Sequence, residues 1–101
     1  MSLEKVLNQV KVFDPSRKLF EFGNGDKFWV VAKSQEEATK CLVEDYNEEN
    51  VEEMDVIEIP RTEHFEIRDD EYSKIDIWDM IDIDAADECV EVPYMVASTI
   101  C

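Results

Sequence analysis

The stretch LFEFGNGDKFWVVAKSQEEA, residues 19–38, decides the fold. Two β-prone runs, residues 19–22 and 27–32, flank the GNGD segment, whose residues tolerate the positive φ angles of tight hairpin turns. The second run is almost continuously apolar, which is typical of a central strand. A helix is predicted to begin at Ser34, because a serine followed three residues later by glutamate forms a capping box. The sequence therefore predicts a β-hairpin that leads directly into a helix.

The residues after the capping serine have the spacing of an amphipathic helix. Ala38, Cys41 and Leu42 recur at intervals of three and four residues, which places them on one helical face. That face is expected to pack on the hairpin, and the helix is expected to end near Asn47. In a capping box the glutamate also reaches back to the serine amide, so Glu37 is expected to accept a hydrogen bond from that N–H.

Four further segments have the composition or the alternation of strands. They are residues 9–13, 56–59, 64–67 and 93–99. The charged residues 68–74 are expected to form a loop. The last strand is expected to lie at an edge of the sheet, where residues 94–99 could pair across the axis of a homodimer.

A second, shorter helix is predicted over residues 76–83, with Asp76 as its N-cap, although the alternating isoleucines there also permit a strand. The chain is thus predicted to be α+β: a mainly antiparallel sheet of four to six strands, one amphipathic helix packed on a face, and a second short helix. Its 101 residues suffice for one core, so a single acidic domain spanning residues 1–101 is expected. The residues expected to supply much of that core are Phe20, Phe22, Trp29, Val31, Leu42, Ile57, Ile59, Trp78 and Val96.

The charge of the chain is large and unevenly placed. It has 26 acidic and 10 basic residues, a formal net charge of -16. Residues 1–33 hold six basic and four acidic residues, whereas residues 34–101 hold four and 22. Such a surface repels nucleic acid and anionic membranes, so neither is expected as a direct partner. The expected partner is a basic protein surface.

The cysteines and the hydropathy pattern indicate a cytoplasmic protein. Cys41, Cys89 and Cys101 are odd in number and lack the spacing of a disulfide framework or a zinc site, which fits a reducing compartment. No apolar run approaches the roughly 18–20 residues of a membrane span, and the N-terminus lacks a signal-peptide pattern. If a phage encodes the chain, that compartment is the cytoplasm of the host cell.

No set of residues has a pattern typical of a catalytic or metal site. His64 is the single histidine, and a small enzyme that uses it or a cysteine is an alternative hypothesis. The carboxylates of residues 76–88 are dense enough to suggest calcium, but they lack the alternate oxygens and the glycine of an EF-hand loop. We therefore predict no catalytic residues, metal or cofactor, and an uncharacterised acidic structural or cation-binding module remains a further alternative.

Two groups of carboxylates are the candidate partner-binding residues. Helical carboxylates one turn apart are spaced by about 5.4 Å, and the phosphates of a DNA strand by about 3.4 Å, so two acidic rows could imitate a short phosphate backbone. The alternative is a solvated face that keeps the protein soluble. The first group, on the helix and its exit, is Glu36, Glu37, Glu44, Asp45, Glu48, Glu49, Glu52 and Glu53. The second group is Asp69, Asp70, Asp76, Asp79 and Asp82.

Two short motifs resemble a loose group of small bacteriophage and mobile-element proteins. In that group a W-V-V-A strand runs into an S-x-E-E-A helix, as residues 29–38 do here. The closing residues 93–99, PYMVAST, are similar to the P-F/Y-x-x-A-S/T endings of the same group. Together the motifs cover about a fifth of the chain.

This resemblance implies an origin more than a mechanism. Small acidic phage proteins with assigned roles are often stoichiometric inhibitors of host defence, among them anti-CRISPR and anti-restriction proteins, and some occupy nucleic-acid-binding surfaces. By analogy, the chain is expected to be a non-enzymatic inhibitor of that kind, with a nucleic-acid-binding defence protein as its partner. The analogy carries no catalytic residues with it.

Overall fold

A computed structural model of the chain describes residues 10–24, 26–47, 49, 51–69, 73–87 and 89–98. It consists of two compact units. The sheet unit comprises Pro15–Pro60 and Val92–Cys101, and the hairpin unit comprises Met1–Asp14 and Arg61–Glu91. The predicted α+β class is confirmed. That the two units together form a single folded domain stays a prediction.

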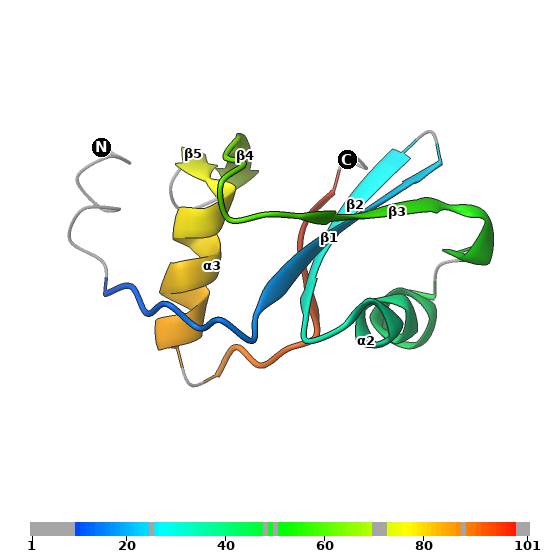
Figure 1. Ribbon diagram of the computed structural model, residues 1–101, viewed down its shortest axis with the longest axis horizontal. Coiled ribbons are helices and arrows are strands. Elements are labelled where there is room, and N and C mark those ends of the chain that lie inside the picture. The colour runs from blue at the N-terminus through cyan, green and yellow to red at the C-terminus, as the bar shows by residue number, and fades with distance from the viewer. Residues whose placement is uncertain are drawn as a thin grey trace. The chain divides into compact units, whose positions relative to one another are not determined.

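The sheet unit is built on four antiparallel strands in the order β3-β1-β2-β6. β1 (Lys18–Asn24) and β2 (Asp26–Ala32) form the predicted hairpin, and β2 lies inside the sheet as expected. β3 (Asp55–Ile59) pairs with β1, and β6 (Tyr94–Ser98) pairs with β2. The last strand therefore lies at an edge, as predicted (Figure 1).

The helix after β2 begins and ends close to the predicted residues. α2 (Gln35–Lys40) continues as the wider π-helix η1 (Cys41–Asp45), and Asn47, with φ 53°, turns the chain away just beyond it. Ser34 Oγ accepts from the N–H of Glu37 at 3.2 Å. The reciprocal bond was predicted wrongly, because the Glu37 carboxylate accepts from the N–H of Lys33, one residue before the cap, at 3.1 Å.

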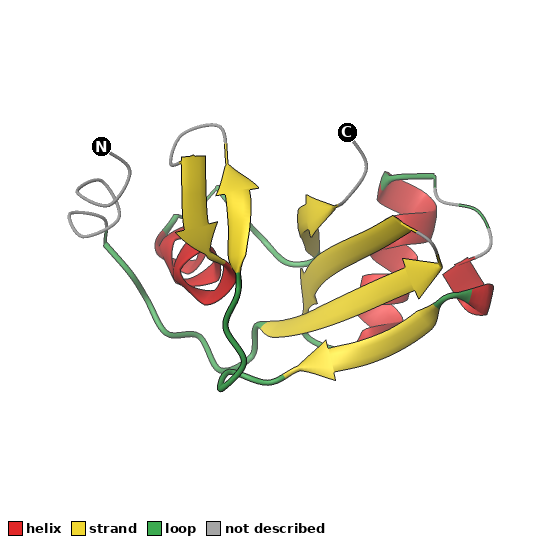
Figure 2. Cartoon of the chain, turned by 90° about the horizontal axis from the view of Figure 1, so that it is seen from above, coloured by secondary structure: helices red, strands yellow, loops and turns green. Residues whose placement is uncertain are grey.

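The main core of the sheet unit lies between the sheet and α2, which covers one face (Figure 2). Alternate residues of the hairpin point to this face, because side chains alternate along a strand. The 3₁₀ turn η2 (Val51–Glu53) adds Val51 to the same core. The buried residues of this core are Phe20, Phe22, Phe28, Val30, Ala32, Ala38, Cys41, Leu42 and Val51.

On the opposite face, Leu19 lies between Val31 and Ile59 in the strand register, and all three side chains are buried. Three predicted core residues differ. Trp29 is half-buried, since its indole donates to Glu21 Oε1 at 2.9 Å. Ile57 is 53% exposed, because it lies on the edge strand β3. The third, Val96, is half-buried at a bulge, where β2 residues 29 and 30 pair with β6 residues 97 and 95.

The hairpin unit contains β4 (Glu66–Asp69), β5 (Ser73–Asp76) and α3 (Ile77–Ala86). The loop predicted over residues 68–74 is wrong, since Arg68 pairs with Lys74 in an antiparallel ladder. The buried pair Ile67 and Ile75 anchors that ladder despite its charged surroundings. Residues 70–72 lie outside the described residues.

The second helix is confirmed and runs three residues further than predicted, with Asp76 as its N-cap. Trp78 and Ile81 are buried, as the helical interpretation requires. None of the helices that the structure describes is long and apolar enough to cross a membrane.

Two of the predicted strands are corrected. Residues 10–13 form neither helix nor strand, and residue 9 lies outside the described residues. Instead of a ladder, the described part of this segment has a backbone bond to α3, from Val12 N–H to Asp82 C=O at 2.9 Å. The strand predicted over residues 64–67 begins only at Glu66, because the Phe65 C=O accepts from the N–H of Ile77 at the start of α3.

Candidate partner-binding surface

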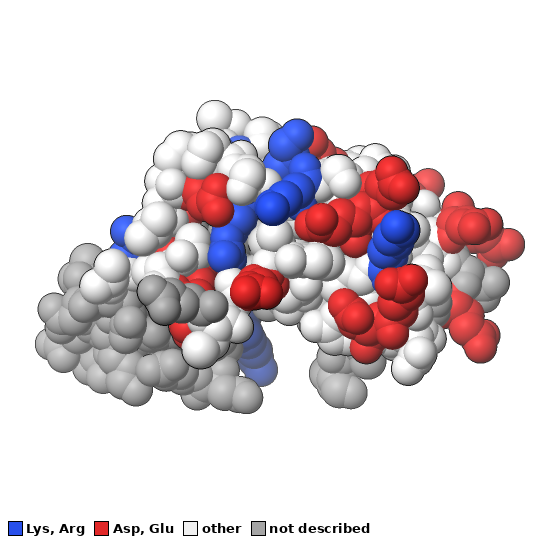
Figure 3. Space-filling model, turned by 90° about the horizontal axis from the view of Figure 1, so that it is seen from below, with Lys and Arg blue, Asp and Glu red and all other residues white. Residues whose placement is uncertain are grey.

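The first acidic group forms an exposed surface on the sheet unit. We define the acidic patch as the exposed carboxylates on α2, η1, η2, β3 and their connections. Its members are Glu36, Glu44, Asp45, Glu49, Glu52, Glu53, Asp55 and Glu58. Acidic side chains gather at the right of Figure 3, the end at which Figure 1 draws α2. Of the predicted group, Glu37 is half-buried and caps α2, and Glu48 lies outside the described residues.

The acidic patch lacks internal compensation. Residues 34–60 contain ten acidic residues and one basic residue, Lys40. Among the described residues, no patch carboxylate forms an ion pair. Asp45 lies close enough to the buried Cys41 thiol to affect its titration. Burial, followed by the charge of Asp45, raises the pKa of Cys41 to about 11, so this thiol stays protonated at neutral pH.

Two exposed apolar side chains lie beside these carboxylates. Val43 is 47% exposed and Tyr46 is 43% exposed. Val43 lies within η1, and Tyr46 is the residue that caps its C-terminal end. Tyr46 Oη accepts from the N–H of Met95 in β6 at 3.4 Å, which fixes the ring beside the sheet. An exposed aromatic and aliphatic pair among charged residues is typical of protein-binding surfaces.

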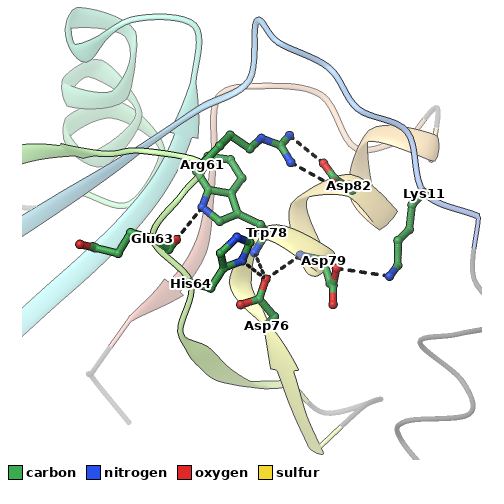
Figure 4. A network of polar contacts seen from close by, with 8 residues as sticks. All are labelled: Lys11, Arg61, Glu63, His64, Asp76, Trp78, Asp79 and Asp82. Atoms are coloured by element: carbon green, nitrogen blue, oxygen red, sulfur yellow. Dashed lines mark hydrogen bonds and ion pairs between the residues drawn. The ribbon is translucent and has the colours of Figure 1, made fainter.

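The second acidic group is engaged inside the hairpin unit (Figure 4). Asp82 accepts two hydrogen bonds from the Arg61 guanidinium at 2.7 and 2.9 Å. Asp79 pairs with Lys11 at 3.2 Å. Asp76 Oδ2 accepts from the N–H groups of Trp78 and Asp79 and lies 3.0 Å from His64 Nδ1. These three aspartates therefore organise α3, and the Asp69 side chain and Asp70 lie outside what the structure describes.

Arg61 is the residue of this network that sequence reasoning missed. Its guanidinium carbon lies 4.6 Å from the centre of the Phe13 ring and 4.3 Å from that of the Trp78 ring. The Trp78 indole in turn donates to the Glu63 C=O at 2.9 Å. No spacing in the sequence connects Arg61 with these residues, because they come from three separate segments.

His64 is placed by its contact with Asp76. The hydrogen bond to that carboxylate raises the pKa of His64, and the charges of Asp76 and Asp79 add to the effect. The ring is largely exposed. No three His, Cys, Asp or Glu side chains are grouped so as to hold a metal ion in the described part of the chain.

Comparison of the chain with protein-family models, with curated proteins and with solved structures found no match. A functional proposal therefore depends on the chemistry of the two units themselves. Of the two acidic groups, only the acidic patch presents carboxylates without an ion-pair partner among the described residues.

Proposed function

We propose that the chain is a non-enzymatic binding protein that docks its acidic patch on a basic, nucleic-acid-binding surface of a partner protein and inhibits that partner stoichiometrically. The observation that carries this proposal is the difference between the two acidic groups. Asp76, Asp79 and Asp82 each contact a basic side chain, whereas the patch carboxylates are exposed and form no ion pair among the described residues.

The physical argument concerns the cost of the patch. Like charges held close together repel one another and destabilise the folded chain. A basic partner relieves that repulsion and is attracted at long range, which speeds association. The exposed side chains of Val43 and Tyr46 then offer apolar contact at short range.

We further propose that the partner is a host defence protein. The chain would then be an anti-CRISPR or anti-restriction inhibitor of phage origin. The support for this is the resemblance of residues 29–38 and 93–99 to small phage proteins. The acidity of the patch supports the proposal that the surface of the partner is basic.

Two matched triple variants test the proposal. The first replaces Glu44, Glu49 and Glu52 of the patch by glutamine. The second makes the same replacement at Glu63, Glu66 and Glu91, which are exposed in the hairpin unit and change the net charge equally. Each immobilised protein is offered a bacterial lysate at physiological salt, and captured proteins are challenged with duplex DNA.

We expect the wild type and the hairpin-unit variant to capture a basic nucleic-acid-binding protein that DNA releases. The patch variant should bind it more weakly, on the order of tenfold, because three close charge contacts are lost. Equal capture by both variants would show that only net charge matters and would contradict the patch. Capture that DNA does not affect would contradict the shared nucleic-acid surface.

A further inference from the structure

The two edges of the four-stranded sheet differ in regularity. β6 has a bulge opposite Trp29 and Val30, and Tyr46 Oη bonds its Met95 N–H. β3 pairs with β1 in unbroken register over all five of its residues. Among the described residues, β1 is the only strand with which β3 pairs. The outer edge of β3 is therefore the more regular of the two.

β3 lacks the lysines, prolines and bulges that often protect edge strands, although it is short and its two charged residues, Asp55 and Glu58, are both acidic. Proteins protect edge strands with lysines, prolines or bulges. The sequence DVIEI contains neither residue type, and the first proline, Pro60, follows the last residue of the strand. Ile57 is 53% exposed on the face away from α2, and Asp55 lies on the same face. Glu58 is exposed on the other face.

We propose that the outer edge of β3 binds an extended, basic segment of the partner protein as an added strand. This inference rests on the function proposed above. It adds which residues of the partner lie opposite the β3 residues of the acidic patch. Main-chain hydrogen bonds supply affinity in strand addition, and alternate side chains supply specificity. A second copy of this chain is disfavoured at the same edge, because two β3 strands, each with Asp55 and Glu58 and no basic residue, would repel one another.

The side chains of β3 define the segment that fits. In an antiparallel pair, directly opposite residues have Cβ atoms about 4.5–5.5 Å apart, close enough for charge pairs. The partner strand therefore places basic residues opposite Glu58 and Asp55 and an apolar residue opposite Ile57. Read along the partner, this order is basic, apolar, any residue, basic.

Synthetic peptides test the register on the intact protein. The probe is a ten-residue peptide with the core Lys-Val-Thr-Lys, and binding is followed by the amide signals of β3 in NMR spectra. One control has the same composition in scrambled order. Two others carry backbone N-methyl groups on alternate residues, one along each edge of the peptide, so only one of the two blocks the edge that meets β3.

We expect the core peptide to shift the signals of residues 55–59 and to protect amides there from hydrogen exchange. One N-methylated peptide should bind at least about tenfold more weakly than the other, because it loses the main-chain bonds. Equal binding of both methylated peptides, or shifts confined to α2, would overturn strand addition while leaving the acidic patch as a binding surface.

Two protein variants complete the test. Ile57→Lys places a charge on the edge at an exposed position, and Val10→Lys makes the same change at an exposed position of the hairpin unit. Circular dichroism checks that both fold. The first should weaken peptide binding by about tenfold or more and the second by less than about twofold. If the protein forms concentration-dependent dimers and Ile57→Lys abolishes them, the edge binds a second copy and the proposal is overturned. The lysate experiment tests the proposed function separately.

Discussion

The two acidic groups have similar compositions but opposite roles in their units. In the hairpin unit, Asp76, Asp79 and Asp82 contact His64, Lys11 and Arg61 and hold α3 in place. In the sheet unit, the acidic patch extends along α2, η1, η2 and β3 with Lys40 as the single basic residue of that stretch. The fold therefore supplies counter-charges to the three aspartates of the hairpin unit and, among the described residues, none to the carboxylates of the acidic patch.

The largest expected effect comes from the centre of the hairpin unit. Trp78→Ala removes a buried indole that stacks on Arg61 and bonds Glu63. The free energy of unfolding should fall by about 3–5 kcal/mol, measured by urea denaturation. In this variant Trp29 is the remaining tryptophan, so its fluorescence reports the sheet unit.

That fluorescence also tests the single-domain prediction. If the two units unfold as one, the transition seen by Trp29 must shift with that of the whole chain followed by circular dichroism. A loss of stability below about 1 kcal/mol would contradict the buried, bonded position of Trp78.

The next effect compares one carboxylate from each group. Asp82→Asn weakens a bidentate, half-buried pair and should destabilise the chain by about 1–3 kcal/mol. Glu52→Gln, in the acidic patch, should change stability by less than about 0.5 kcal/mol, since its side chain is exposed. Denaturant midpoints measure both. If the two variants have equal effects, the proposed difference between the groups disappears.

The helix caps should contribute about equally in the two units. Ser34→Ala and Asp76→Ala each remove an N-cap acceptor, at a cost of about 1 kcal/mol. Thermal unfolding measures each loss. Ser34→Thr and Asp76→Asn are the controls that keep an acceptor and should retain most of the stability. A silent Asp76→Ala variant would mean that this aspartate is not needed to begin α3.

The smallest effect is a pH dependence confined to the hairpin unit. Asp76 raises the pKa of His64, so protonated His64 is favoured in the folded state. The resulting stabilisation is fully present below the unfolded pKa of about 6.5 and is lost as the pH rises through the folded pKa. An NMR titration of the His64 ring should give a midpoint above that value, and Asp76→Asn should lower it. A midpoint unchanged by Asp76→Asn would contradict this contact.

Local chemistry allowed most of the sheet unit to be predicted. The GNGD turn, the capping serine and the apolar run of β2 each act over a few residues, and the structure has the hairpin and α2 where they indicated. The residues wrongly predicted to lie in the core differ because of tertiary structure. Ile57 is exposed because β3 is an edge, and strand order is not encoded in the alternation of one strand.

The hairpin unit was harder to predict because its contacts are long-range. The charged residues 68–74 do not have the alternation of a hairpin. The ladder forms because Ile67 and Ile75, on either side of them, pair and are buried. The candidate site divided in the same way: Glu36 on α2 and both glutamates of η2 are exposed, as expected, whereas Glu37 is half-buried. The carboxylates of Asp76, Asp79 and Asp82 instead contact basic side chains up to 68 residues away.

The position of β6 in the chain affects how the protein is made. Its residues 94–98 are among the last of 101, yet they pair with β2, whose residues 26–32 are synthesised early. The whole segment 61–91 of the hairpin unit is synthesised after β3 and before β6. Until β6 has been synthesised, the apolar strand β2 therefore has an uncovered edge, and nascent chains stopped before residue 94 should be more prone to aggregate than longer ones.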